Sequence, residues 1–381
     1  MKNKILPLSL VIILALSINS ATSQTKIPPQ ARVTMNQFLA TFLDLQPFMV
    51  SDKKIETQKE REKISNELKR LARLSVDLRK MHSFESTGFK ISAELLTQEL
   101  KNASRAFANG NLGYARRSLR STLDVCSSCH SQVPQSPAVN WKFDEKALKG
   151  SDIERAEFLF ATRQYAPAEK LFYDFAKNFK KDQNVLDVER GLVRILAIHL
   201  RAGRNPNLAR KKLLELSENQ NFSSPLKERL AVWITELRAL ERLNPPDIEK
   251  TSAGRLVRFV SKRLDAKKTQ SFGDSEMPDA LYFSGLLYQF LNTRREKDVI
   301  ADLLYWLALY EKRLGENYPQ ELSRLYFKEC VLRFSKDPTA KLCFQEYESM
   351  QNLEYTGSSG TKIPLDVKRD LESLRNSIEP K

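Results

Sequence analysis

Two cysteines and a histidine stand within five consecutive residues, Cys126-Ser127-Ser128-Cys129-His130, in a chain that contains only four Cys and three His. On a helix, residues three apart lie on one face, so both thiols can reach the two vinyl groups at one edge of a haem. The imidazole that follows can then bind the iron as its proximal ligand. This spacing is that of covalent c-type haem attachment, and it predicts one haem c held by Cys126, Cys129 and His130.

Two other uses of a Cys-x-x-Cys pair agree less well with this sequence. A closed structural zinc site takes about four Cys or His ligands, and the sequence has no second pair at ligand spacing. A redox dithiol of the thioredoxin type is expected beside a βαβ pattern, and the sequence shows none. Haem attachment therefore remains the main prediction.

The first 23 residues have the pattern of a secretory signal peptide. Lys2 and Lys4 precede an apolar run over residues 5–16, and small residues follow at Ala21-Thr22-Ser23. The apolar run is too short to span a bilayer, and no other stretch is long and apolar enough. We therefore expect residues 1–23 to be removed, the mature chain to have no transmembrane segment, and the periplasm to be its location.

The composition favours helices, since only 12 glycines stand against 62 Lys or Arg and 47 Asp or Glu. The net charge of +15 favours acidic partners or anionic lipid headgroups. The basic residues are scattered along predicted helix faces, and most of them are explained as ordinary solvent-exposed surface. The chain is also predicted to be exported. Nucleic acid is therefore not an expected partner.

An all-α fold is predicted, beginning with a four-helix bundle over residues 24–133. Short turns between the helices favour an up-down-up-down order. The end of the fourth helix then meets the starts of the first and third helices and the end of the second, which is where a haem would lie. An extended entry arm is expected over 24–33, and apolar stripes predict helices over about 34–47, 55–81, 89–108 and from 111 to shortly past His130.

The run Asn109-Gly110-Asn111-Leu112, then Ala115, Leu119 and the haem motif, resembles the cytochrome c prime family over about residues 34–133. Its relatives include a soluble four-helix b-type cytochrome. The resemblance implies that the opposite face of the iron turns toward the first helix, where the b-type relative has Met and most c prime members have an apolar residue. The family usually follows its haem His with an aromatic and a basic residue, whereas Ser131-Gln132 stands here.

The second axial ligand is left open between three alternatives. Met35 lies at about the place of the b-type ligand, and His82 competes with it. A third alternative is five-coordinate iron. A Met ligand raises the reduction potential and suits an electron carrier, whereas an open site favours a diatomic gas. Phe38, Phe84 and Phe89 are expected to pack against the haem, and His199 is expected to be structural.

Beyond a linker at 134–150, paired helices are predicted. Residues 154–172 resemble a tetratricopeptide unit, with small residues where two helices approach closely. Further irregular pairs predict a tetratricopeptide-like α-solenoid over 151–351. Cys330 and Cys343 fall on the last pair and are predicted to form a disulfide. Residues 352–381 are expected to be a tail with one capping helix.

Beyond the haem motif, the sequence shows no catalytic constellation, so we do not expect an enzyme. The prediction is a periplasmic monohaem electron-transfer protein whose helical repeats dock a redox partner, which the basic charge suggests is acidic. Two alternatives stay open: a haem-based sensor or scavenger of NO, CO or O2 that signals through the repeats, and a non-redox scaffold. Members of the cytochrome c prime family often pair through their first helices, so a homodimer also stays open.

Overall fold

The computed structural model describes residues 29–51, 55, 57–81, 86–132, 144–265, 276–293, 298–358 and 360–379. These residues form fifteen α-helices, short 3-10 and π-helical turns, and one hairpin whose two strands have two residues each. The predicted all-α class is therefore confirmed. The predicted signal peptide and most of the predicted linker lie outside the described residues. No helix in the described part of the chain is long and apolar enough to cross a membrane.

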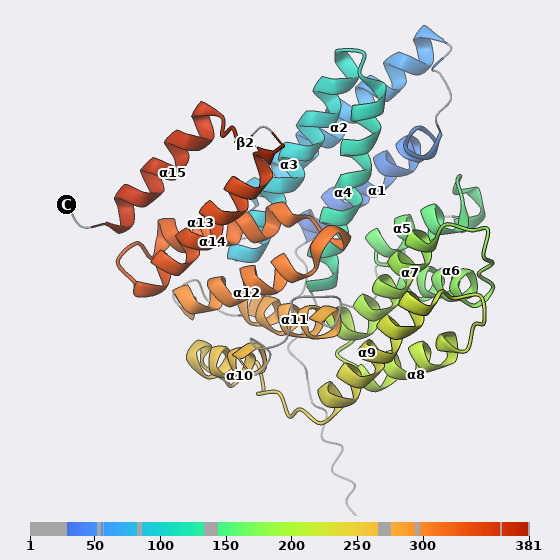
Figure 1. The fold of residues 1–381 in the computed structure, drawn as a ribbon. Coiled ribbons are helices and arrows are strands. Elements are labelled where there is room, and N and C mark those ends of the chain that lie inside the picture. The colour runs from blue at the N-terminus through green and yellow to red at the C-terminus, as the bar shows by residue number, and fades with distance from the viewer. Residues whose placement is uncertain are drawn as a thin grey trace, which may run out of the picture.

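The first four helices pack around one shared core (Figure 1). The first packs against the second and the fourth, and the third also packs against the second and the fourth. Their apolar stripes supply the buried residues, as the 3.6-residue spacing requires. The helices are α1 (Pro29–Val50), α2 (Gln58–Lys80), α3 (Thr87–Ala108) and α4 (Leu112–Gln132).

Two boundaries differ from the expectation, and both have local causes. The extended arm expected to reach residue 33 is wrong over its last five residues, because α1 already begins at Pro29. Proline suits the first turn of a helix, where its missing N–H has no intrahelical partner. The third helix begins at Thr87, because the Ser86 hydroxyl accepts a hydrogen bond from the Phe89 N–H and caps the helix there.

The rest of the chain runs through successive antiparallel helices, with α5 to α9 at the right of the view in Figure 1 and α12 to α15 at the left. Ser151 and Glu154 form a capping box that starts the first of them. The helices are α5 (Asp152–Ala161), α6 (Tyr165–Lys177), α7 (Val185–Ala197), α8 (Pro206–Ser217), α9 (Ser224–Glu241), α10 (Ala253–Asp265), α11 (Met277–Thr293), α12 (Ala301–Arg313), α13 (Gln320–Arg333), α14 (Pro338–Glu354) and α15 (Leu365–Ile378).

Shorter elements join some of these helices. A π-helix, Ile198–Ala202, continues α7, and 3-10 turns occur at Glu145–Ala147 and Gly315–Asn317. Strands β1 (Thr356–Gly357) and β2 (Gly360–Thr361) form the hairpin before α15, which packs on α13 and α14. Cys330 of α13 and Cys343 of α14 are joined by a disulfide, with their Cα atoms 6.3 Å apart.

Later helices return to the first four, so the buried residues form one continuous core. Helix α5 packs against α4, and α11 packs against both α3 and α4. The π-helix also packs against α4, and α13 packs against α3. Two hydrogen bonds also join the start of α3 to α11 and α13. The Ser86 hydroxyl donates to Asn292 Oδ1 at 2.9 Å, and Arg333 Nη1 donates to Thr87 Oγ1 at 3.0 Å. One end of the first four helices is thus enclosed by the rest of the chain.

Candidate functional site

A hollow lies at that enclosed end, lined by residues of all four of the first helices and of the end of α5. It contains about 730 Å³ of empty space, its open mouth included. Small-molecule and cofactor sites are mostly apolar. The lining agrees with this pattern, since α1 contributes Phe38, Leu39 and Phe42 and α3 contributes Phe89 and Leu96.

The haem motif lines the same hollow. Cys126, Cys129 and His130 all border it from α4, and Met35 borders it from α1. The structure thus brings together the three predicted haem-binding residues, one of the two predicted distal ligands, and two of the three predicted aromatic side chains. The remaining predicted residues, His82 and Phe84, lie outside the described residues.

His130 is oriented by a main-chain oxygen. Its Nδ1 lies 2.6 Å from the carbonyl oxygen of Ala161, which can only accept a hydrogen bond, so Nδ1 carries the proton. Ala161 is the last residue of α5, and the last carbonyls of a helix have no intrahelical partner. Burial lowers the pKa of His130 to about 4, so the ring is neutral near pH 7. A neutral ring protonated on Nδ1 has an unprotonated Nε2, the form in which histidine binds a metal.

Both thiols are kept protonated by their surroundings. Burial raises the pKa of Cys126 to about 12 and that of Cys129 to about 11, and neither residue is in a disulfide. A redox-active dithiol normally has a thiol pKa below the ordinary value. The pair therefore lacks the electrostatic environment of a thioredoxin-type centre.

The described side chains also do not form a site for a bare ion. Nowhere in residues 29–379, as far as the structure describes them, do three or more His, Cys, Asp or Glu side chains gather so as to hold a metal. A structural zinc ion would need about four such ligands. The two thiols and the imidazole line the hollow without meeting at a single point.

A cluster of buried charges, which we call the ionic centre, lies beside the hollow. Arg194 of α7 is fully buried and donates from Nε to both oxygens of Glu157, at 3.0 Å each, and from Nη2 to Asp124 Oδ1 at 2.6 Å. Arg201 of the π-helix is also fully buried and donates to Glu311 Oε1 at 2.8 Å. Buried charges persist in proteins only when they are paired in this way.

The ionic centre connects the two helices that carry the His130 contact. Asp124 is in α4, two residues before Cys126, and Glu157 is in α5, four residues before Ala161. Because Arg194 bonds to both, it fixes α4 and α5 relative to each other. The guanidinium also lies over the rings of Phe160 and Tyr318, with centroid distances of 5.2 and 5.1 Å.

Sequence reasoning did not find these residues. A usable signal existed for Arg194 and Arg201, because both interrupt an apolar run over residues 191–202 that is too hydrophobic for a solvated helix. No signal existed for Ala161, since its contribution is a backbone oxygen that every residue type carries.

Comparison with known proteins shows no family model that matches the chain, no similar curated protein and no similar solved structure.

Proposed function

We propose that this chain is an exported c-type cytochrome that carries one haem c in the hollow and transfers electrons in the periplasm. Cys126 and Cys129 would hold the haem through thioethers, and His130 would bind its iron through Nε2. In this proposal α1–α4 are a haem-carrying four-helix bundle, and the helix pairs from α5 to α14 are a tetratricopeptide-like solenoid that contributes to partner docking.

The observation that carries the proposal is the hydrogen bond from His130 Nδ1 to Ala161 in a hollow that both motif cysteines line. A backbone acceptor on Nδ1 fixes the tautomer and orients the ring, as is usual for histidines that bind metals. A haem c would supply an iron that changes by one electron. Phe38, Phe89 and Leu96 would exclude water from it, and a low dielectric around the iron influences its reduction potential.

A second candidate function is the binding of a diatomic gas, and the composition of the α1 wall supports it. Apart from Met35, α1 contributes only Phe38, Leu39 and Phe42 to the lining. If Met35 does not bind the iron, the opposite side of the haem is apolar and leaves room for NO, CO or O2. Absorption spectra of the reduced protein with and without carbon monoxide separate the two functions, because only an open sixth position shifts the spectrum immediately.

The proposal is tested by expressing the full chain with its leader in a bacterium that has a cytochrome c maturation system. We expect a coloured protein whose mass exceeds that of the mature chain by one haem and whose haem stays attached after denaturation. Cys126→Ser with Cys129→Ser should abolish the attachment. The matched control, Cys330→Ser with Cys343→Ser, also removes two thiols and should retain it. A colourless protein with the mass of the chain alone contradicts the proposal.

A further inference from the structure

The exposed face of α2 and α3 contains a second hollow. It is separate from the hollow at the haem motif and is lined by charged rather than apolar side chains. We call it the basic groove, and it contains about 640 Å³ of space open to solvent. Its walls are Lys69 and Arg73 of α2 and Lys101 and Arg105 of α3, all exposed. Its floor is made by two smaller, half-buried residues, Ala72 and Ser104.

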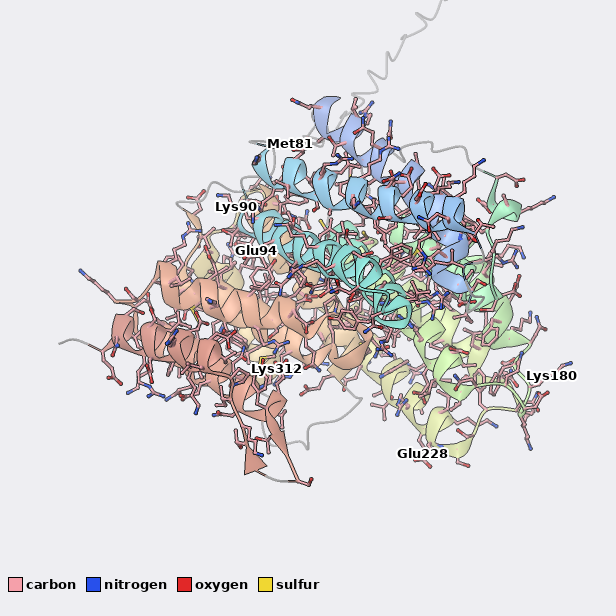
Figure 2. All side chains as sticks on the ribbon, turned by 90° about the horizontal axis from the view of Figure 1, so that it is seen from above. Met81, Lys90, Glu94, Lys180, Glu228 and Lys312 are labelled. Carbon is pink, nitrogen blue, oxygen red and sulfur yellow. A yellow bond between two sulfur atoms is a disulfide. The ribbon has the colours of Figure 1, made fainter. Side chains whose placement is uncertain are left out.

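The helix geometry explains why the groove exists. Residues four apart lie on the same face of a helix with Cβ atoms about 6 Å apart, so each helix presents a row of two cations along the seam. Ala72 and Ser104 are too small to fill the space between the rows. Figure 2 labels Met81 at the end of α2 and Lys90 near the start of α3, and these two helix ends lie together, as in an antiparallel pair.

The four cations are not used by the fold. Within the part of the chain that the structure describes, none of them forms an ion pair, and Arg105 Nη2 donates a hydrogen bond to Asn102 Oδ1 at 3.3 Å. Neighbouring charges on α2 differ in this respect, since Arg70 is paired with Glu67. Four like charges around one groove repel each other, so an anionic occupant would lower the free energy of this face.

We infer that the basic groove binds an acidic helix on the surface of a partner protein, one that carries carboxylates four residues apart. The two rows of cations run along the helices, which matches two carboxylates in line better than one compact phosphate. The floor and walls contain no aromatic side chain on which a nucleic-acid base could stack. The large hydrophobic residues found exposed in the described part of the chain include none on α2 or α3, so this face lacks the apolar residues with which interfacial helices enter a lipid surface.

The groove is separate from the hollow at the haem motif, but a partner bound in the groove would lie near the proposed haem. Leu78 of α2 lines the hollow and Lys69 lines the groove, nine residues earlier. At 1.5 Å per residue the two levels are about 14 Å apart along α2. The inference concerns only the outer face of two helices, so it stands or fails independently of haem attachment.

The test is a fluorescence binding assay with the full mature protein and a labelled Ala-based helical peptide that carries pairs of Glu four residues apart. The same peptide with Gln in place of Glu is the probe control. Lys69→Glu with Arg73→Glu should weaken binding of the Glu peptide at least tenfold at low salt. Lys101→Glu with Arg105→Glu, on the opposite wall, should do the same. Glu is a good helix former, and we expect all variants to keep the circular dichroism of the wild type.

The matched control variant is Lys180→Glu with Lys181→Glu, which changes the net charge by the same amount at exposed positions between α6 and α7. Lys180 lies far from Met81 and Lys90 in Figure 2. This variant should bind the Glu peptide within about twofold of wild type. Equal weakening in the groove and control variants overturns the inference in favour of general charge attraction. Inorganic phosphate, vesicles with anionic headgroups or double-stranded DNA that compete with the peptide and bind more tightly through the same residues overturn it in favour of those ligands.

Discussion

The hollow at the Cys126–His130 motif and the ionic centre lie side by side and are built in opposite ways. The hollow is lined mainly by apolar side chains. These side chains lack van der Waals partners on the side that faces the empty space. The ionic centre is filled, with Arg194 and Arg201 fully enclosed by carboxylates and aromatic rings. The hollow is open to solvent and bounded mainly by apolar side chains, whereas the ionic centre is enclosed.

The geometry of the site depends more on the ionic centre than on the hollow. A buried ion pair contributes little net stability, because desolvation offsets most of the attraction. It does fix the relative position of the helices that it joins, and Arg194 joins α4 to α5. The hollow is lined mainly by apolar side chains, whose packing is non-directional and does not fix geometry as an ion pair does. We therefore attribute the His130–Ala161 geometry to the ionic centre and the capacity for a ligand to the hollow.

The largest effect should come from Arg194→Met. The change leaves Asp124 and Glu157 without their buried partner, and breaking such a pair costs about 3–5 kcal/mol. Urea unfolding should show this loss, and the spectrum of the proposed haem should also change because α5 no longer holds His130 in place. The control is Arg190→Met, since Arg190 contacts the same two carboxylates from a half-exposed position and should cost less than about 1 kcal/mol. Equal losses for the two variants would contradict the role given to Arg194.

A smaller effect is expected at the wall of the hollow. Met35→Ala removes a half-buried side chain that already borders empty space, and we expect a loss of about 1 kcal/mol or less. The matched change Leu119→Ala, at a fully buried position in α4, should cost about 2–5 kcal/mol in the same unfolding experiment. If Met35 binds the iron, its removal should also convert a low-spin spectrum to a high-spin one. An unchanged spectrum excludes Met35 as the ligand.

The smallest effect should come from a polar contact outside both regions, between a buried histidine and a half-buried glutamate. His199 Nε2 lies 3.1 Å from Glu169 Oε1, and this contact lowers the pKa of Glu169. Because the folded-state pKa is the lower one, the pair stabilises the fold above the unfolded pKa of about 4.3 and the contribution is lost as the pH falls further. The stability difference between wild type and Glu169→Gln should be about 1 kcal/mol or less near pH 6 and should shrink toward pH 3. A difference that grows with acidity would reverse the sign and disprove this assignment.

The sequence predicted the parts of the molecule that depend on local pattern. Apolar spacing predicted the first four helices, the last of which contains the haem motif, to within a few residues, apart from the start of α1. It also placed Met35, Phe38, Phe89 and the haem motif at one end of those helices, where the structure finds the hollow. Pattern could not show that α5 and α11 return to enclose that end, because such packing depends on contacts between residues far apart in the chain.

The hydrogen bond between His130 and Ala161 limits which sequence changes this chain can accept during evolution. The acceptor is a peptide oxygen, so replacement of the Ala161 side chain by another small one leaves the bond in place, whereas lengthening or shortening α5 by one residue would rotate that oxygen away by about 100°. Evolution of this protein should therefore tolerate other small residues at position 161 but not insertions or deletions within α5.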